Sequence, residues 1–112
     1  MIDGLDPVIH APKRLAAMAI LANTSAATFT SLRERLQVSE SDLSKQMGAL
    51  QRAGYVSVSK LGRGRGGVTR YNITAAGSVA FRSHRAALRA LIAEVDVGEV
   101  EVFAHDDSVP AG

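Results

Sequence analysis

Apolar residues recur at helical spacing in a short central segment of the chain, residues 39–53. Leu43, Met47 and Leu50 lie four and then three residues apart, which places them on one face of a helix. Ser39 and the Asp three residues later are typical of a capping box at a helix start. The Gly just beyond the segment is typical of a helix end. The pattern predicts a short helix with one buried face and one polar face.

Two further helices are predicted before this segment. A lead-in over residues 3–12 holds at most a short helical turn, and KRLAAMAILAN from Pro12 repeats apolar residues at three- and four-residue spacing. After a small polar loop at residues 23–27 and the β-prone TFT, the run TSLRERLQV predicts a helix capped by Thr30. Only two residues separate it from the next cap, which is helix-turn-helix spacing.

The pattern after residue 54 changes to alternation, which predicts a β-hairpin. The strands are YVSVSKL at 55–61 and VTRYNI at 68–73, and GRGRGG forms a six-residue loop between them. Thr74 then caps a long predicted helix that ends at residue 95. Beyond it we expect a short strand or disorder.

The long helix repeats apolar residues at spacings of 3, 4, 3 and 4, as a heptad seam does. We therefore expect it to pack on an apolar partner, a second copy of the chain. The predicted dimer interface consists of Phe81, His84, Leu88, Leu91, Ile92 and Val95.

The length of 112 residues indicates one domain, predicted over residues 1–95, followed by an acidic tail at 96–112. All 13 Lys and Arg but only six of the 11 acids precede residue 96. A basic body favours a polyanionic partner. The absence of cysteine, of a membrane-length apolar run and of a signal-peptide pattern leads us to expect a cytoplasmic protein.

The order of helices, hairpin and long helix predicts an α+β fold, mainly α: a winged helix-turn-helix with a two-stranded wing and a C-terminal dimerisation helix at 74–95. A short helix with small polar side chains fits the DNA major groove, and basic side chains around it bind phosphates. The candidate DNA-binding residues on the helices are Arg33, Arg35, Ser39, Ser41, Ser44, Lys45, Gln46 and Arg52.

The predicted wing adds four cations, and no acid lies between residues 61 and 72. Arginines that alternate with glycines at an exposed tip suit contact with the minor groove or its phosphates. The candidate DNA-binding residues of the wing are Lys60, Arg63, Arg65 and Arg70.

A family resemblance rests on the run LRERLQVSESDLSKQMGALQRAGYVSVSKLGRGRGGVTRYNITAAG. It resembles the winged-helix domains of MarR-like and ArsR-like bacterial transcriptional regulators. DLSKQMGALQRAGYVSV looks like their recognition helix leading into the first wing strand, and YNITAAG like the start of their dimer helix. The resemblance implies a homodimer that binds a pseudo-palindromic site in double-stranded DNA.

Other functions receive less support from the residues. The glycine-rich loop lacks GKS or GKT, the three histidines stand apart, and no catalytic triad context is present, so we expect no enzyme, no cofactor and no metal site. Two alternatives stay open: a winged-helix protein-interaction module, and RNA binding through the RGRGG tip. A small-molecule effector is neither supported nor excluded.

Overall fold

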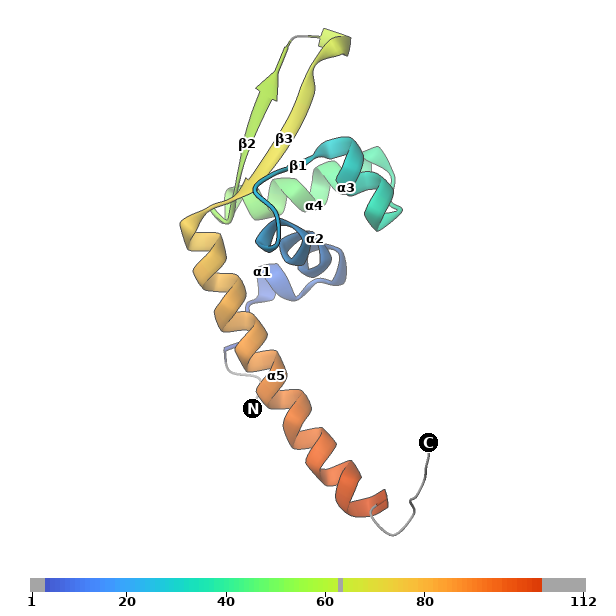
Figure 1. Cartoon of the computed structure of the whole chain (residues 1–112), viewed down its shortest axis with the longest axis vertical. Helices are drawn as coiled ribbons and strands as arrows, with labels where there is room; N and C mark the ends of the chain where they lie inside the picture. Colours follow the sequence, from blue (N-terminus) through green and yellow to red (C-terminus); the bar gives the residue numbers. More distant parts are fainter. Residues whose placement is uncertain (1–3, 63, 104–112) are drawn as a thin grey trace.

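The computed structural model describes residues 4–62 and 64–103, apart from the side chains of Arg65 and of residues 95–103. Helices α1 to α4 form a bundle, a hairpin projects from one end of it, and the long helix α5 runs past α1 and onward away from the bundle (Figure 1). The elements are α1 (Pro7–His10), α2 (Pro12–Ala22), β1 (Ala27–Thr28), α3 (Phe29–Leu36), α4 (Glu40–Arg52), β2 (Val56–Leu61), a 3₁₀ turn (Gly64–Gly66), β3 (Val68–Ile73) and α5 (Ala75–Phe103).

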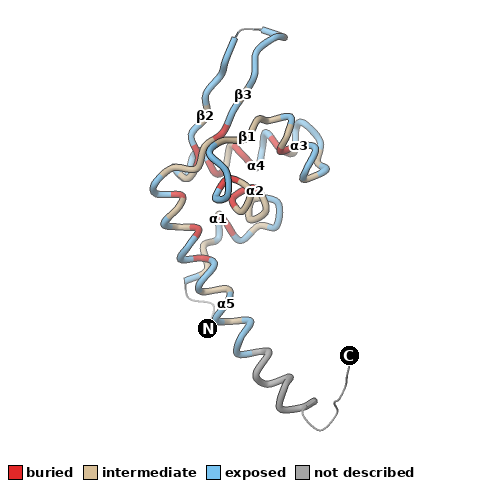
Figure 2. The backbone as a smooth tube through the Cα atoms, viewed as in Figure 1, coloured by how far each residue is buried: buried red, intermediate tan, exposed pale blue. Residues whose placement is uncertain are grey.

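The core lies where α2, α3 and α4 meet and extends to the base of the hairpin and the first half of α5, and Figure 2 shows buried segments in all of these places. The apolar stripe predicted for residues 39–53 is fully buried, which confirms that helix and its orientation. Complete burial of one such side chain contributes about 1.5–3 kcal/mol. Seven core side chains from these three helices are at most 1% exposed: Ala17, Met18, Leu21, Leu32, Leu43, Met47 and Leu50.

Local hydrogen bonds define the two ends of α4. The Ser39 hydroxyl accepts a bond from the Asp42 backbone N–H at 3.1 Å, which confirms the predicted cap. At the other end Gly54 has a φ of 81°, and its N–H bonds the Gln51 carbonyl at 2.9 Å. Because this left-handed conformation favours glycine, Gly54 ends the helix and directs the chain into β2.

Helix α3 begins earlier than predicted. Its N-cap is Thr28, whose hydroxyl accepts a bond from the Ser31 N–H at 3.0 Å, so the prediction of Thr30 as the cap is wrong. Ala27 and Thr28 pair with β3, so the sheet has three strands in the order β1-β3-β2. The strands β2 and β3 form the predicted two-stranded wing, and β1 adds a third strand that was not predicted. The strand is short because Phe29 already begins the helix.

Helix α5 begins as predicted but continues further. The Thr74 hydroxyl accepts a bond from the Gly77 N–H at 2.9 Å, which confirms the cap. The helix extends to Phe103, so the predicted end at residue 95 and the strand expected after it are wrong over this range. A helix satisfies its own backbone groups, whereas an isolated strand needs a partner. The rest of the predicted tail, residues 104–112, lies outside the described residues.

Two residues of the predicted dimer interface are buried inside the protomer. Phe81 is 8% exposed and His84 is fully buried, because the first half of α5 packs on α1 and α2. Because so little of either side chain is exposed, they cannot contribute much to contact with a second copy. The prediction that Phe81 and His84 belong to the dimer interface is therefore wrong. The heptad spacing identified the correct face of the helix but not which parts of it are covered by the chain itself.

His84 joins the N-terminal segment to α5. Its Nδ1 accepts a bond from the Asp6 backbone N–H at 2.9 Å, and the Asp6 carboxylate accepts a bond from the Tyr55 hydroxyl at 2.6 Å. The His10 ring lies edge-on to His84, with 5.4 Å between ring centroids. An acceptor role for Nδ1 places the proton of the neutral ring on Nε2, which is buried and has no partner among the described residues.

We expect stability to fall when the pH drops below about 6.5, the pKa of an unfolded histidine. Burial, followed by the nearby His10, lowers the pKa of His84, although the Asp6 carboxylate opposes this shift. The unfolded chain then binds a proton that the folded chain excludes, so acid favours unfolding. Denaturant titrations at about pH 7.5 and 5.5 should show the loss, and His84→Gln should reduce it. His10→Gln removes only the secondary cause of the lowered pKa and leaves His84 buried, so it should reduce the loss less than His84→Gln does. Equal pH dependence in wild type and His84→Gln would contradict the assignment.

Candidate nucleic-acid interface

The side of α4 opposite its buried stripe is open to solvent. Ser41, Ser44, Lys45 and Arg52 are exposed there. Gly48 lies among them, and the Arg52 guanidinium lies close to it. These residues carry hydroxyl groups and cations, which bind base edges and phosphates. The structure brings four of the predicted DNA-binding residues onto one outward face.

The wing turns one side of its hairpin toward α4. The strand register pairs Val58 with Tyr71 and Lys60 with Thr69, and alternate residues of a strand share a side. Val58 and Tyr71 pack against the core, so Lys60 leaves the sheet on the side that faces α4. A groove of about 440 Å³ lies between this side of the wing and α4, and its lining includes Glu40, Ser44, Gln51 and Lys60.

The remaining wing cations do not all share that side. Arg70 lies opposite Ser59 in the register and is exposed on the other side of the sheet, next to β1. The four wing cations therefore do not form one surface with α4, because strand alternation separates Lys60 from Arg70. Arg63 and the side chain of Arg65 lie outside the described residues.

The two arginines of α3 also lie apart from the groove between α4 and the wing. Arg35 is exposed and lines a hollow formed with Ala19, Ile20 and Asn23 at the C-terminal end of α2. Arg33 is partly buried in the last turn of α3, where its carbonyl accepts a bond from the Gln37 N–H at 2.8 Å. Neither of them lines the groove between α4 and the wing.

Gln46, another predicted DNA-binding residue, is engaged within the protein. Its side-chain oxygen accepts a bond from Arg14 at 2.8 Å, and its amide donates to Asp42 at 2.9 Å. Asp42 also forms an ion pair with Lys13. The Lys13 ammonium is the main cause of the lowered pKa of Asp42. Gln46 is therefore a connection between α2 and α4 rather than part of the open face.

Sequence reasoning missed Lys13 and Arg14 as residues of this region. They begin α2, some thirty positions from their partners in α4. The sequence signal was two adjacent cations directly after Pro12, at the start of a helix whose N-cap makes no side-chain bond. Only the packing of α2 on α4 shows that these cations flank the same face as Lys45.

Metal-binding clusters and membrane-spanning helices are not found in the described part of the chain. No group of three or more His, Cys, Asp or Glu residues there is placed to hold a metal ion. None of the described helices is both long enough and apolar enough to span a bilayer. The exposed polar face of α4 and the surfaces beside it are the strongest candidate for a functional site.

The chain is similar in sequence and in structure to known winged-helix proteins. The sequence profile of the winged helix DNA-binding domain matches residues 13–92. The chain is similar to the transcriptional regulator homologue from Pyrococcus horikoshii, with a TM-score of 0.74 and 26% identity over 80% of this chain and 88% of that one. No curated protein sequence matches the chain.

Two other solved structures show the same fold at lower identity. YusO from Bacillus subtilis has a TM-score of 0.65 and 18% identity, covering 91% of this chain and 74% of its own. ZitR from Lactococcus lactis, a zinc-responsive MarR family member, has a TM-score of 0.57 and 19% identity, covering 78% of this chain and 60% of its own.

Proposed function

Because the chain belongs to the winged helix DNA-binding domain family, we propose that it is a dimeric transcriptional regulator that binds a specific double-stranded DNA sequence. In this proposal α4 enters the major groove and the wing contacts the neighbouring phosphates or minor groove. Its place of action is the cytoplasm, where a bacterial or archaeal chromosome lies. The transcriptional regulator homologue from Pyrococcus horikoshii, which has the same fold, supports this proposal.

The observation that carries the proposal is the open face of α4 and its position beside the wing. A 13-residue helix is about 20 Å long and 10–12 Å wide, and the major groove is about 12 Å wide. The residues that would meet base edges are Ser41, Ser44 and Lys45, since they lie in the first turns of α4 and are exposed. Lys60, across the groove beside α4, is placed to meet a phosphate.

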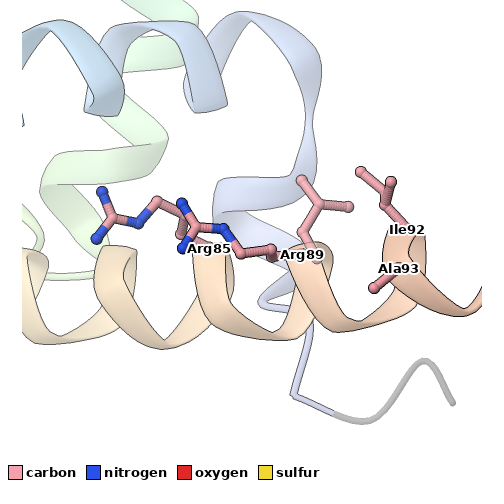
Figure 3. Close-up of a pocket in the computed structure, with 5 residues that line it drawn as sticks. Arg85, Arg89, Ile92 and Ala93 are labelled. Atoms are coloured by element: carbon pink, nitrogen blue, oxygen red, sulfur yellow. The ribbon is translucent and has the colours of Figure 1, made fainter. Parts of the chain in front are cut away.

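Dimerisation is proposed through the part of α5 beyond the bundle. The face that buries Phe81 and His84 continues there through Leu88 and Leu91. Figure 3 shows Arg85, Arg89, Ile92 and Ala93 on the same turns of α5. A shallow groove of about 330 Å³ runs among these residues and Leu88, and Ile92 is 49% exposed. The proposed interface retains Leu88, Leu91 and Ile92 from the sequence prediction, while the side chain of Val95 lies outside the described residues.

Selection of bound duplexes from a random pool at two salt concentrations tests the proposal. We expect enrichment of two half-sites related by a two-fold axis, about 34–36 Å apart, because a dimer presents α4 twice. Weak, uniform retention that disappears at high salt would contradict sequence-specific binding. Preferential retention of single-stranded RNA in a parallel pool would favour the RNA alternative. Absence of retention in both pools would favour a protein-interaction module.

We expect Ser44→Ala and Lys45→Ala to change which sequence the protein prefers. Both side chains are exposed in the first turns of α4, where contacts with base edges discriminate by about 1–3 kcal/mol. Repeating the selection with each variant measures the change at individual base positions. Arg35→Ala is the control, because its hollow lies at the end of α2 and its loss should leave the preference intact. Identical preferences in all variants would contradict the orientation proposed for α4.

A further inference from the structure

A basic cleft lies beside α4, between the start of α2 and the exposed face of α4. Its volume is about 230 Å³, whereas a water molecule occupies about 30 Å³ in the liquid, so the cleft admits a hydrated phosphate group. The cleft shares none of its lining with the groove beside the wing. The lining residues of this α2 cleft are Ala11, Pro12, Lys13, Arg14, Lys45 and Gln46.

The contacts that the cleft's cations make within the protein do not neutralise all of their positive charge. Arg14 donates to two neutral acceptors, the Val8 carbonyl and the Gln46 side-chain oxygen, which leave its charge uncompensated. Lys45 is exposed, and no ion pair forms with it in the described part of the chain. Lys13 pairs with Asp42 but is 51% exposed, and an ammonium has three donors, so it retains hydrogen-bonding capacity.

The cleft and the wing lie on opposite flanks of α4. Ser44 and Gln51 face the wing, whereas Lys45 and Gln46 face α2, because residues 44 and 45 are separated by about 100° around a helix. A helix in the major groove has a phosphate backbone on each side of it. With Lys60 on one flank and Lys13, Arg14 and Lys45 on the other, the protein presents cations toward both.

We propose that the α2 cleft binds a backbone phosphate of the DNA, on the side of α4 away from the wing. The inference rests on the proposed function, and it adds Lys13 and Arg14 to the interface. The phosphate accepts hydrogen bonds from the free donors of Lys13, while Arg14 and Lys45 add positive charge at the cleft. Asp42 opposes this binding, since its carboxylate is held beside Lys13 and repels a phosphate.

A competing explanation gives Lys13 a purely internal role. In that case the Lys13–Asp42 pair only braces α2 against α4, and removal of either partner would loosen the recognition helix. The two explanations predict opposite signs for removal of the acid. If the cleft binds phosphate, Asp42→Asn frees Lys13 and strengthens DNA binding, whereas loss of a brace weakens it.

The test compares wild type, Lys13→Gln and Asp42→Asn on the duplex enriched by the selection, with affinities measured over a series of salt concentrations. For Lys13→Gln we expect roughly fivefold weaker binding for each subunit of the proposed dimer. The salt slope should fall by about 1.8, because each of the two subunits loses one phosphate contact worth about 0.9. For Asp42→Asn we expect tighter binding. The asparagine amide oxygen can still accept the bond from Gln46, which limits the structural effect of the substitution.

Arg82→Gln is the matched control, because Arg82 is an exposed cation on α5 beside the end of α2, away from the α4 face. Its salt slope should equal that of wild type. Thermal unfolding of each variant verifies that the fold is retained. A wild-type affinity and slope for Lys13→Gln, or weaker binding by Asp42→Asn, would overturn the cleft as a phosphate site while wild-type DNA binding stands. Failure of wild type to bind any duplex would instead overturn the proposed function.

Discussion

Substitution of Gly77 by alanine is expected to lower the free energy of unfolding by about 2–3 kcal/mol, although alanine is the better helix former. A Cβ at Gly77 would lie 2.1 Å from the Tyr55 carbonyl oxygen and 2.9 Å from the carbonyl carbon. Both atoms belong to the backbone, so no side-chain rotation relieves the overlap. The same oxygen accepts the Thr74 N–H bond at 3.0 Å, so a shift of α5 also disturbs the start of that helix.

Gly48→Ala provides the matched control, since it is the same substitution in another helix. The nearest atom to a Cβ at Gly48 is in the Arg52 guanidinium at 3.2 Å, the end of a flexible side chain that can move away. We expect this variant to gain up to about 1 kcal/mol from helix propensity. Denaturant unfolding measures both variants. A Gly77→Ala protein as stable as wild type would show that α5 does not rest on Tyr55 as described.

The contact at Gly77 also matters for DNA binding in the proposed dimer. Tyr55 directly follows the C-terminal turn of α4, and the first turn of α5 rests on its carbonyl. A displacement at this point rotates α5 relative to α4 and is amplified along the helix. The separation of the two recognition helices would then change, so even a folded Gly77→Ala protein should lose affinity for the half-site pair.

The double substitution Leu88→Glu with Ile92→Glu should convert the proposed dimer to monomer and reduce affinity for the paired half-sites by about 100-fold or more. Two carboxylates on the continued inner face of α5 would each have to be desolvated in an apolar interface. A monomer holds one half-site only and lacks the effective concentration that the second subunit supplies. Sedimentation measures the mass, and binding to the enriched duplex measures the affinity.

Ala86→Glu with Ala90→Glu is the control for this experiment. Both alanines are exposed, and the helical repeat places them on the opposite side of α5 from Leu88 and Ile92. This variant carries the same added charge and should remain a dimer with wild-type affinity. If the Leu88 and Ile92 variant also stays dimeric, the subunits associate through another surface. If wild type is monomeric on DNA, the dimer proposal fails altogether.

Elements defined by neighbouring residues were predictable from the sequence. The stripe of Leu43, Met47 and Leu50 predicted α4, and Ser39 and Gly54 predicted its ends, because helix periodicity and capping depend on residues within a few positions. The hairpin followed from alternation on each side of GRGRGG, and its strands are within one residue of the prediction. The profile match over residues 13–92 confirms the winged-helix assignment that this order of elements indicated.

The partners of individual side chains were less accessible. His84 was placed on a seam for a second subunit, but it is buried against a backbone group 78 residues earlier in the chain. Gln46 was assigned to DNA, but Arg14, 32 residues away, bonds its side chain. In both cases the sequence pattern selected a side chain that forms a hydrogen bond with a distant segment of the same protomer. It could not identify the segment that contacts the side chain, since that depends on how distant helices pack.

By itself, the sequence determined the helices, the hairpin and the outward polar face of α4, because each depends on periodicity and turn residues within a single segment. Only the tertiary structure decided which cations lie together. It placed Lys60 toward α4, turned Arg70 to the opposite side of the sheet, and brought Lys13 beside Lys45. The physical reason is that contacts between residues distant in the sequence set the register of β2 on β3 and the packing of α2 on α4. A pattern of neighbouring residues does not identify those contacts.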